Sequence, residues 1–189
     1  MRTLEEVARS IAKILNELKI DYAIVGGIAV SSWGNVRTTR DVDVIVSLEE
    51  KDIKKFVRAL KKMNFSTTEK DMADALREKT HFTIFDRLSD YHIDAKGAYS
   101  EKDIQTLKTK KKVNLGRIKC YLASPEGTIA DKLLLDSEQD IKDAEGIYAR
   151  QMKNLDMRYL KKMCKEIGVY KDFLEMKNRV EKHLQEMKK

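Results

Sequence analysis

The sequence predicts an α+β fold in which helices pack on a mixed sheet and a helical region follows. Tyr22–Val25 and Asp41–Val46 are short segments rich in aliphatic and β-branched residues, a composition typical of strands. His81–Phe85 and Tyr91–Ala95 are two further strand-like segments, joined by a loop of hairpin length. Beyond residue 122, the apolar residues recur only at helical spacing.

Length and composition fit this organisation. At 189 residues, we expect one domain of about 100–150 residues with a smaller appendage. We place the core at residues 1–122 and the helical C-terminal region at residues 123–189. Apolar residues make up 42% of the chain, and the net charge of +7 favours an anionic partner such as a nucleotide, RNA or an acidic protein. A solvated basic surface without a partner explains the charge equally well.

The first twenty residues predict an amphipathic helix over Thr3–Leu18. Its apolar stripe, which includes Val7 and Ile11, is interleaved with acidic and basic residues, a pattern found in neither a signal peptide nor a transit peptide. Because no apolar run approaches 18 residues, we expect no membrane span. Cys120 and Cys164 lack the spacing of metal ligands, so we expect reduced thiols in a cytoplasmic protein.

The stretch Tyr22–Val46 carries the candidate chemistry. Successive side chains of a strand alternate between faces at about 3.3 Å per residue, so Asp41 and Asp43 project from one side with Cβ atoms about 6–7 Å apart. Two carboxylates so placed can converge on one divalent ion. Val42 and Val44 occupy the other face, where they can bury against helices. The alternative is an edge strand with polar outward positions, which does not explain the flanking motifs.

Two adjacent glycines precede this strand and follow the first one. Gly26 and Gly27 have no Cβ, so the backbone can turn sharply there. Its amide N–H groups can then approach an anion at the start of the next helix. A phosphate cradle beside paired carboxylates suits a nucleoside triphosphate with its magnesium ion.

Past the second strand, local signals predict one more helix and then short strands. Ser47 and Glu50 form a candidate capping box for a helix over Leu48–Met63. From Phe65 the pattern changes to that of short strands. Lys108–Lys112 is the densest basic run of the chain; it is either a set of salt-sensitive contacts to RNA phosphates or a solvated loop.

The C-terminal region reads as a series of helices. Ser124 is a candidate N-cap, with Pro125 at the first helical position. Two tail helices are expected over Asp156–Ile167 and Tyr170–Met187. The apolar stripe of the last helix can pack on its own chain or pair with a second copy, so a monomer and a homodimer both stay open.

The central stretch resembles the nucleotidyltransferase signature of the DNA polymerase β superfamily. In that signature, a Gly-Gly or Gly-Ser pair after the first strand is followed by a strand bearing Asp-x-Asp. The basic loop before the carboxylates narrows the resemblance to the AbiEii-like branch. The matching residues are Gly26, Gly27, Arg37, Thr39, Asp41 and Asp43. The resemblance covers about 25 residues and implies a polymerase β-like core.

The resemblance also implies the catalytic and metal-binding residues. Asp41 and Asp43 would share metal ions with a third carboxylate on a neighbouring strand, for which Asp94 is the candidate. The text after Ser124 resembles the conserved C-terminal portion of AbiEii-like proteins. It implies an active-site Lys132 with a downstream Asp140 or Asp143, although a surface lysine is the competing interpretation.

The nucleotide would be held by residues around the glycine turn. The implied nucleotide-binding residues are Gly26, Gly27, Ser31, Arg37 and Thr39. Gly27 stands where many members carry serine. A hydroxyl contact to the triphosphate would therefore come from Ser31 or Ser32, or be replaced by a backbone contact.

The implied activity is transfer of a nucleoside monophosphate from an NTP to an unidentified acceptor hydroxyl, with release of pyrophosphate. Mg²⁺ is the expected cofactor, with Mn²⁺ as the alternative, and the acceptor is RNA, a protein or a small molecule. Two other classes stay open. One is a catalytically silent module that binds nucleotide or RNA, and the other is the toxin of a toxin–antitoxin pair with an antitoxin partner.

Overall fold

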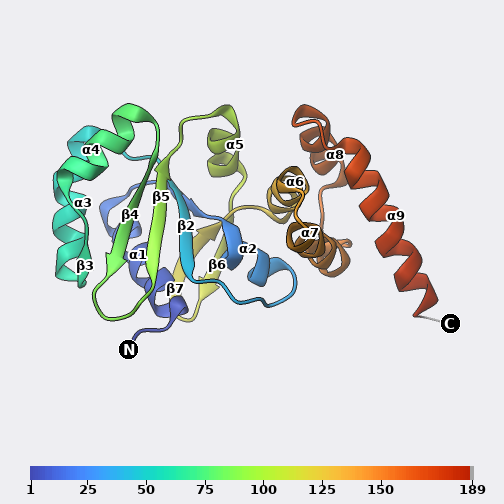
Figure 1. Ribbon diagram of the computed structural model, residues 1–189, viewed down its shortest axis with the longest axis horizontal. Coiled ribbons are helices and arrows are strands. Elements are labelled where there is room, and N and C mark those ends of the chain that lie inside the picture. Colours follow the sequence, from blue (N-terminus) through green and yellow to red (C-terminus); the bar gives the residue numbers. More distant parts are fainter. Residues whose placement is uncertain (188–189) are drawn as a thin grey trace. The chain divides into compact units, whose positions relative to one another are not determined.

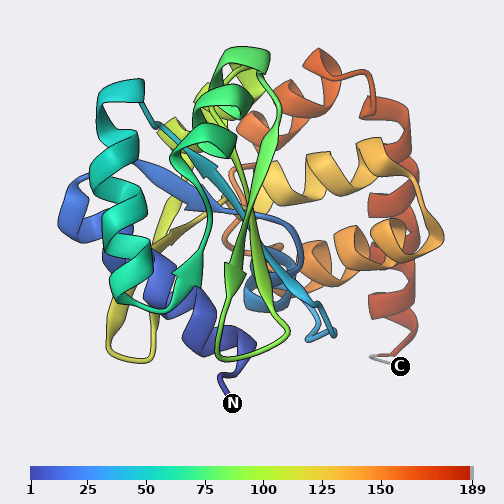
Figure 2. The same ribbon diagram turned by 60° about the vertical axis from the view of Figure 1, so that its left-hand side comes forward.

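The computed structural model describes residues 1–187 and divides the chain into two compact units (Figures 1 and 2). The first unit comprises residues 1–28 and 38–123, and the second comprises residues 29–37 and the chain from residue 124 onward. The chain passes from the first unit to the second within α2 (Gly26–Trp33).

The first unit is built on a mixed sheet (Figure 1). Its elements are α1 (Leu4–Leu18), β1 (Tyr22–Ile24), β2 (Asp41–Val46), α3 (Glu50–Lys62), β3 (Phe65–Ser66), α4 (Glu69–Glu78), β4 (His81–Asp86), β5 (His92–Gly97), α5 (Glu101–Thr109), β6 (Lys111–Leu115) and β7 (Ile118–Leu122). The strand order is β3-β4-β5-β2-β1-β7-β6. β2 pairs in parallel with β5 and antiparallel with β1, whereas β1 pairs in parallel with β7. The predicted α+β fold with a mixed sheet is confirmed.

The two faces of β2 differ as the alternation of its sequence predicts. Val42 and Val44 are buried, with exposed fractions of 0% and 2%, whereas Asp41 and Asp43 are half-buried. Ile93 on the neighbouring strand is buried in the same way. One face of the sheet therefore belongs to the apolar core, and the other presents carboxylates.

The carboxylate face is covered at one end only. Ile45 clusters with Ala23 and with Leu107 of α5, which closes that face toward the end of β2. Asp41 and Asp43 precede Ile45 on the strand and keep partial exposure. The start of β2 is thus the accessible part of this face.

The N-terminal helix forms as predicted. Thr3 and Glu6 make a reciprocal capping box at the start of α1, and Lys19 ends the helix in the left-handed conformation with φ of 56°. Val7 and Ile11 lie in the buried stripe, as expected for an amphipathic helix. In both views of the first unit, α1 lies beside α3 (Figures 1 and 2).

The predicted cap of the next helix is wrong. α3 begins at Glu50 instead of Leu48, and its N-cap is Glu49, which makes no side-chain capping bond. The amide of Ser47 donates to the carbonyl oxygen of Asp21 at 2.7 Å, so Ser47 still continues the strand register. Leu48 is buried, and the helix starts two residues after it, at Glu50.

Two short helices replace part of the region that we expected to contain strands. α4 is capped by Thr68 and buries only Met72 and Ala75, too small a stripe to show as helical periodicity. α5 is capped by Ser100. The basic run Lys108–Lys112 is therefore the end of α5 and the start of β6, and no long loop is present there.

The second unit is helical. Beyond residues 29–37 its elements are α6 (Pro125–Leu135), α7 (Glu138–Gln151), α8 (Met157–Glu166) and α9 (Tyr170–Glu186). The predicted Ser124 cap is confirmed, since its hydroxyl accepts from the Gly127 amide. Val30 joins Ile129, Ile147 and Phe173 in its apolar core. Throughout residues 1–187, no helix is both long enough and apolar enough to cross a membrane.

Candidate active site

Three side chains on two adjacent strands meet on the polar face of the first unit. In the parallel register of β2 and β5, Asp41 is opposite His92 and Asp43 is opposite Asp94. Figure 1 shows the two strands side by side at the centre of the sheet. The alternation within each strand puts all four side chains on one face, and all four are half-buried.

Hydroxyl groups hold two of these carboxylates in place. Thr39 donates through Oγ1 to Asp41 Oδ1 at 2.8 Å, and Thr83 of β4 donates to Asp94 Oδ1 at 2.9 Å. His92 Nε2 lies 3.4 Å from Asp94 Oδ2. Within residues 1–187, no lysine or arginine forms an ion pair with Asp41 or Asp94. Neither carboxylate therefore has a lysine or arginine to neutralise it.

The glycine turn lies directly against this site. Gly26 has φ of +59°, a conformation that glycine adopts without strain, and a Cβ there would come within 1.9 Å of Asp43 Oδ2. The Asp43 carboxylate therefore lies over the start of α2. The backbone carbonyl oxygen of Asp43 also accepts a hydrogen bond from the Val25 amide at 2.9 Å. This bond fixes the glycine turn to β2.

Gly27 is required by its neighbour Thr39. A Cβ at Gly27 would lie 2.7 Å from both Cβ and Oγ1 of Thr39. The Thr39 side chain thus fills the space that a serine at position 27 would need, and it brings a hydroxyl to the same place. The same hydroxyl bonds to Asp41.

The donor set fits a divalent cation. Asp41, His92 and Asp94 each offer one ligand atom, and these atoms lie within 4.8 Å of one another. Around a six-coordinate ion with bonds of about 2.1 Å, ligand atoms are about 3.0–4.2 Å apart. If each of these side chains moved by less than about 1 Å, the three ligand atoms would therefore reach the spacing that they need around one ion. The Asp43 carboxylate, which we predicted as a ligand, is not in this group of three and lies toward Gly26.

The second unit holds the other predicted site residues. Lys132 Nζ lies 2.6 Å from Asp140 Oδ1 and 3.6 Å from Asp143 Oδ2. Arg37 Nε lies 3.1 Å from Asp143 Oδ2, without the geometry of a hydrogen bond. Ser31 exchanges long hydrogen bonds with the backbone of Arg37, at 3.3 and 3.4 Å. The roles of Ser31, Arg37 and Lys132 toward a nucleotide stay predictions.

Burial and pairing shape the acidity of this second cluster. Burial favours the neutral acid of Asp140, but hydrogen bonds from Lys132 and Ser137 outweigh it and hold the pKa of Asp140 below its usual range. Lys132 has an exposed fraction of 7% and Asp143 one of 4%. The cluster is thus an ion-pair network largely withdrawn from solvent.

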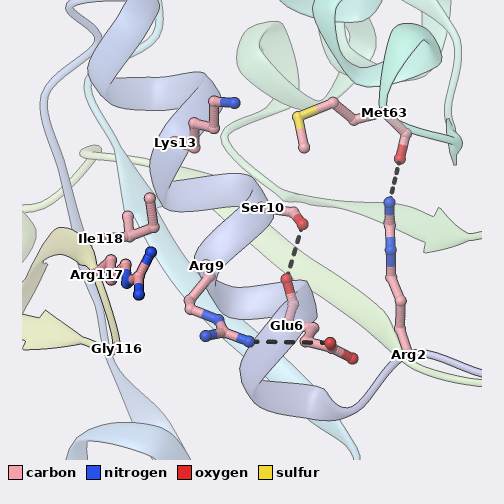
Figure 3. Close-up of a pocket in the computed structure, with 9 residues that line it drawn as sticks. All are labelled: Arg2, Glu6, Arg9, Ser10, Lys13, Met63, Gly116, Arg117 and Ile118. Carbon is pink, nitrogen blue, oxygen red and sulfur yellow. Dashed lines mark hydrogen bonds and ion pairs between the residues drawn. The ribbon is translucent and has the colours of Figure 1, made fainter.

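A basic hollow lies elsewhere on the first unit (Figure 3). It has a volume of about 580 Å³ and is lined by Arg9 and Lys13 of α1 and by Arg117 in the turn between β6 and β7. The ion pairs of Arg9 and Lys13 with glutamates are long, 3.7–3.9 Å, and Arg117 has no ion-pair partner within residues 1–187. None of the site carboxylates lines this hollow.

Sequence reasoning did not single out His92 as a ligand. Alternation along its segment indicates that it shares a face with Asp94, so this part of the signal is local. The decisive fact is that Asp41 is its cross-strand neighbour, which depends on the register between strands about fifty residues apart in the chain. The spacing of residues within the sequence does not determine that register.

The mixed sheet and the carboxylates on its adjacent strands define a domain of the nucleotidyltransferase type. The chain belongs to the family described as "Nucleotidyltransferase of unknown function (DUF6036)", whose model matches residues 2–188. The predicted nucleotidyltransferase family is thereby confirmed, whereas the DNA polymerase β superfamily and its AbiEii-like branch stay predictions. A comparison with curated proteins gave no match.

Solved structures show the same fold. An antigenic nucleotidyltransferase-like protein from Paracoccidioides brasiliensis has a TM-score of 0.59 at 18% identity, over 94% of this chain and 92% of that chain. ANT(2")-Ia, in complex with adenylyl-2"-tobramycin, has a TM-score of 0.57 at 12% identity, over 88% of this chain and 97% of that chain. At these identities the likeness concerns the fold, which includes the helical C-terminal region.

Proposed function

We propose that the protein transfers a nucleoside monophosphate from an NTP to an acceptor hydroxyl and releases pyrophosphate. The observation that carries this proposal is that Asp41 and Asp94 lie on adjacent strands near the Gly26 turn and have no lysine or arginine partner within residues 1–187. Carboxylates in this state attract a divalent cation, and a turn at the start of a helix can receive phosphate oxygens. Membership of a nucleotidyltransferase family supports the same reaction.

The reaction balances as an exchange at the α-phosphorus. The acceptor oxygen forms a bond to that phosphorus, and the bond from it to the oxygen bridging to the β-phosphate breaks. The hydroxyl proton passes to a carboxylate, for which Asp94 is our choice, or to water. Pyrophosphate carries away the electron pair of the broken bond.

Different residues of the first unit would have different roles in this reaction. Asp41, Asp43 and Asp94 would hold Mg²⁺ or Mn²⁺, which when bound stabilises the charge that develops on the phosphate oxygens. The amides of Gly26 and Gly27 would position the triphosphate. Thr39 and Thr83 orient Asp41 and Asp94 through their hydrogen bonds. Thr39 also supplies a hydroxyl next to the glycine pair.

The test of transfer uses NTPs labelled at the α-phosphate, a divalent cation and a cell extract. We expect label to enter one acceptor class and pyrophosphate to form in equal amount. Asp41→Asn should lower both by at least about 10³-fold, because a metal-bound carboxylate stabilises charge in the transition state. Retention of pyrophosphate release in a folded Asp41→Asn protein would contradict the proposal, and NTP binding without release would indicate the silent module.

For the acceptor, we propose RNA, on the evidence of the basic hollow. Arg9, Lys13 and Arg117 place cations from two elements around one concave surface. The β6–β7 hairpin, residues 111–122, contains no acidic residue and four basic ones, one of which is Arg117. Surfaces of this kind bind the phosphodiester backbone through salt-sensitive contacts.

The RNA proposal is tested by binding as a function of salt. Replacing Arg9, Lys13 and Arg117 by glutamine should weaken binding of labelled single-stranded RNA. It should also lower the slope of log K against log salt by about 2. The matched control replaces three exposed lysines of the second unit: Lys161, Lys171 and Lys182. Equal slopes in the two triple variants would exclude the hollow as the RNA site and leave protein or small-molecule acceptors.

We keep the AbiEii-like branch as the narrower family proposal, because the motif from Arg37 to Asp43 is intact. A toxin of this branch would arrest growth when expressed without an antitoxin. The arrest should vanish in Asp41→Asn, and arrest that persists in this variant would separate toxicity from transfer.

A further inference from the structure

His92 changes the chemical character of the cation site. A site built from Asp41, Asp43 and Asp94 would offer oxygen atoms alone. In the structure, the group within ligand distance is Asp41, His92 and Asp94, so one of the three donors is an imidazole nitrogen. Mg²⁺ favours all-oxygen sites, whereas an imidazole nitrogen favours first-row transition metal ions, with an affinity that rises from Mn²⁺ to Cu²⁺.

Its position on the strand supports a ligand role. His92 is opposite Asp41 in the parallel register and two residues before Asp94, so it is the neighbour of both on one face. Its Nε2 atom lies 3.4 Å from Asp94 Oδ2, about the distance between two ligands of one ion. With one-third of its side chain exposed, it can reach solvent and an entering ion.

A plain ion pair with Asp94 is the competing explanation. Such a pair, with both side chains one-third exposed, contributes little to stability. Asp94 already accepts a hydrogen bond from Thr83, which fixes its orientation without His92. An ion pair with Asp94 also does not explain why the Asp41 ligand atom lies within 4.8 Å of the same imidazole.

We infer that His92 is a metal ligand and that the site prefers a divalent first-row transition metal cation, with Mn²⁺ as the probe, over Mg²⁺. This inference rests on the proposed function only for the use of the ion, since the geometry of the site stands by itself. A cation bound here would have ligands from both strands, Asp41 from β2 and His92 and Asp94 from β5.

The experiment detects directly whether an imidazole nitrogen is bound to the metal ion. Mn²⁺ is added to the full chain without nucleotide, and electron spin echo envelope modulation is recorded for the bound ion. We expect a ¹⁴N coupling of directly coordinated imidazole in the wild type. The coupling should be lost in His92→Asn and retained in the matched control His81→Asn, a histidine exposed on the next strand. Circular dichroism checks that both variants are folded.

Affinity supplies the second readout. His92→Asn should weaken Mn²⁺ binding by about 10-fold or more, because loss of a nitrogen donor costs a transition metal ion at least as much as loss of an outer-shell partner. Mg²⁺ binding, measured by competition, should change by less than about 3-fold, since Mg²⁺ gains little from imidazole.

Failure of this inference can be distinguished from failure of the proposed function. Bound Mn²⁺ without ¹⁴N coupling in the wild type, or no Mn²⁺ binding at all, would overturn the role of His92 whatever the activity. Loss of the coupling in His81→Asn as well would do the same. Coupling through His92 together with an absence of NMP transfer would instead confirm the metal ligand and overturn the proposed reaction.

Discussion

The candidate cluster of each unit contains a pair of carboxylates, and the two pairs have different kinds of partner. In the second unit, Asp140 and Asp143 are neutralised by Lys132, with Arg37 as a further cation for Asp143. In the first unit, Asp41 and Asp94 receive only hydroxyl groups and an imidazole. The first pair is half-buried, whereas Asp143 is almost fully buried.

We propose that this difference separates a structural cluster from a functional one. Buried carboxylates need a cation from the protein itself, since an unpaired buried charge is costly. Accessible carboxylates without such a cation keep their charge for an ion from solution. Loss of charge in the first cluster should therefore leave stability unchanged and abolish activity, whereas loss of charge in the second cluster should lower stability.

The largest effect is expected from Asp94→Asn. The amide keeps the shape of the side chain and can still accept from Thr83, but it removes a negative charge from the cation site. NMP transfer should fall by at least about 10³-fold, while the free energy of unfolding should stay within about 0.5 kcal/mol. Denaturant unfolding and pyrophosphate release on one sample check both parts. Loss of stability together with activity would contradict the functional assignment.

Lys132→Met should have the opposite signature. It leaves Asp140 and Asp143 without their shared cation, so the second unit should lose about 3–5 kcal/mol of stability. The chain's one tryptophan, Trp33, packs against the core of this unit, so its fluorescence reports unfolding there.

The control for Lys132→Met is Lys142→Met. Lys142 pairs with Glu138 on an exposed helix face, so its loss should leave the free energy of unfolding nearly unchanged. If Lys132 has the catalytic role suggested by the sequence, transfer by the folded Lys132→Met protein should also fall. A stability loss no larger than that of the control would show that the buried network is not structural.

Gly26→Ala should lower both the stability of the first unit and the transfer activity. The substitution adds a Cβ in the left-handed region and places it 1.9 Å from Asp43 Oδ2, so the carboxylate must move. We expect a loss of more than about 2 kcal/mol together with reduced transfer.

Gly116→Ala is the control for this substitution. Gly116 has the same φ of +59°, but its Cβ would meet only the flexible end of Arg9. The loss there should be about 1–2 kcal/mol, from the backbone conformation alone, and NTP binding should stay unchanged. Equal losses in stability and activity for the two variants would show that Asp43 has no fixed place over the turn.

The sequence predicted those parts of this comparison that local patterns determine. The alternation around Asp41 and Asp43, the glycine turn and the Ser124 cap depend on neighbouring residues, and the structure contains each of them. The environment of the carboxylates depends on contacts between distant segments. Thr83 and His92 reach Asp94 and Asp41 through strand pairing, which no local pattern encodes.

The same distinction between local patterns and distant contacts explains which sequence predictions were wrong. α4 buries only two apolar side chains, so hydrophobic periodicity gave no sign of it, although Thr68 is a standard cap. Ser47 and Glu50 have the spacing of a capping box, but the backbone of Ser47 is already bonded to Asp21. A local signal fails where a tertiary hydrogen bond competes for the same group.

The smallest effect is expected from acid titration of the second cluster. The pKa of Asp140 is held below its usual range by Lys132 and Ser137, against the opposing effect of burial. Asp140 therefore stabilises the fold at pH values above its unfolded pKa of about 3.9, and this contribution is lost as the pH falls through its lower folded pKa.

Asp140→Asn should remove that pH dependence. Between pH 5 and the acid limit, the stability of the second unit, followed by Trp33 fluorescence, should fall less steeply with pH in the variant than in the wild type. If Asp140→Asn keeps the wild-type slope, the bond from Lys132 does not stabilise the ionised carboxylate, and the contrast between the two clusters reduces to a difference in burial.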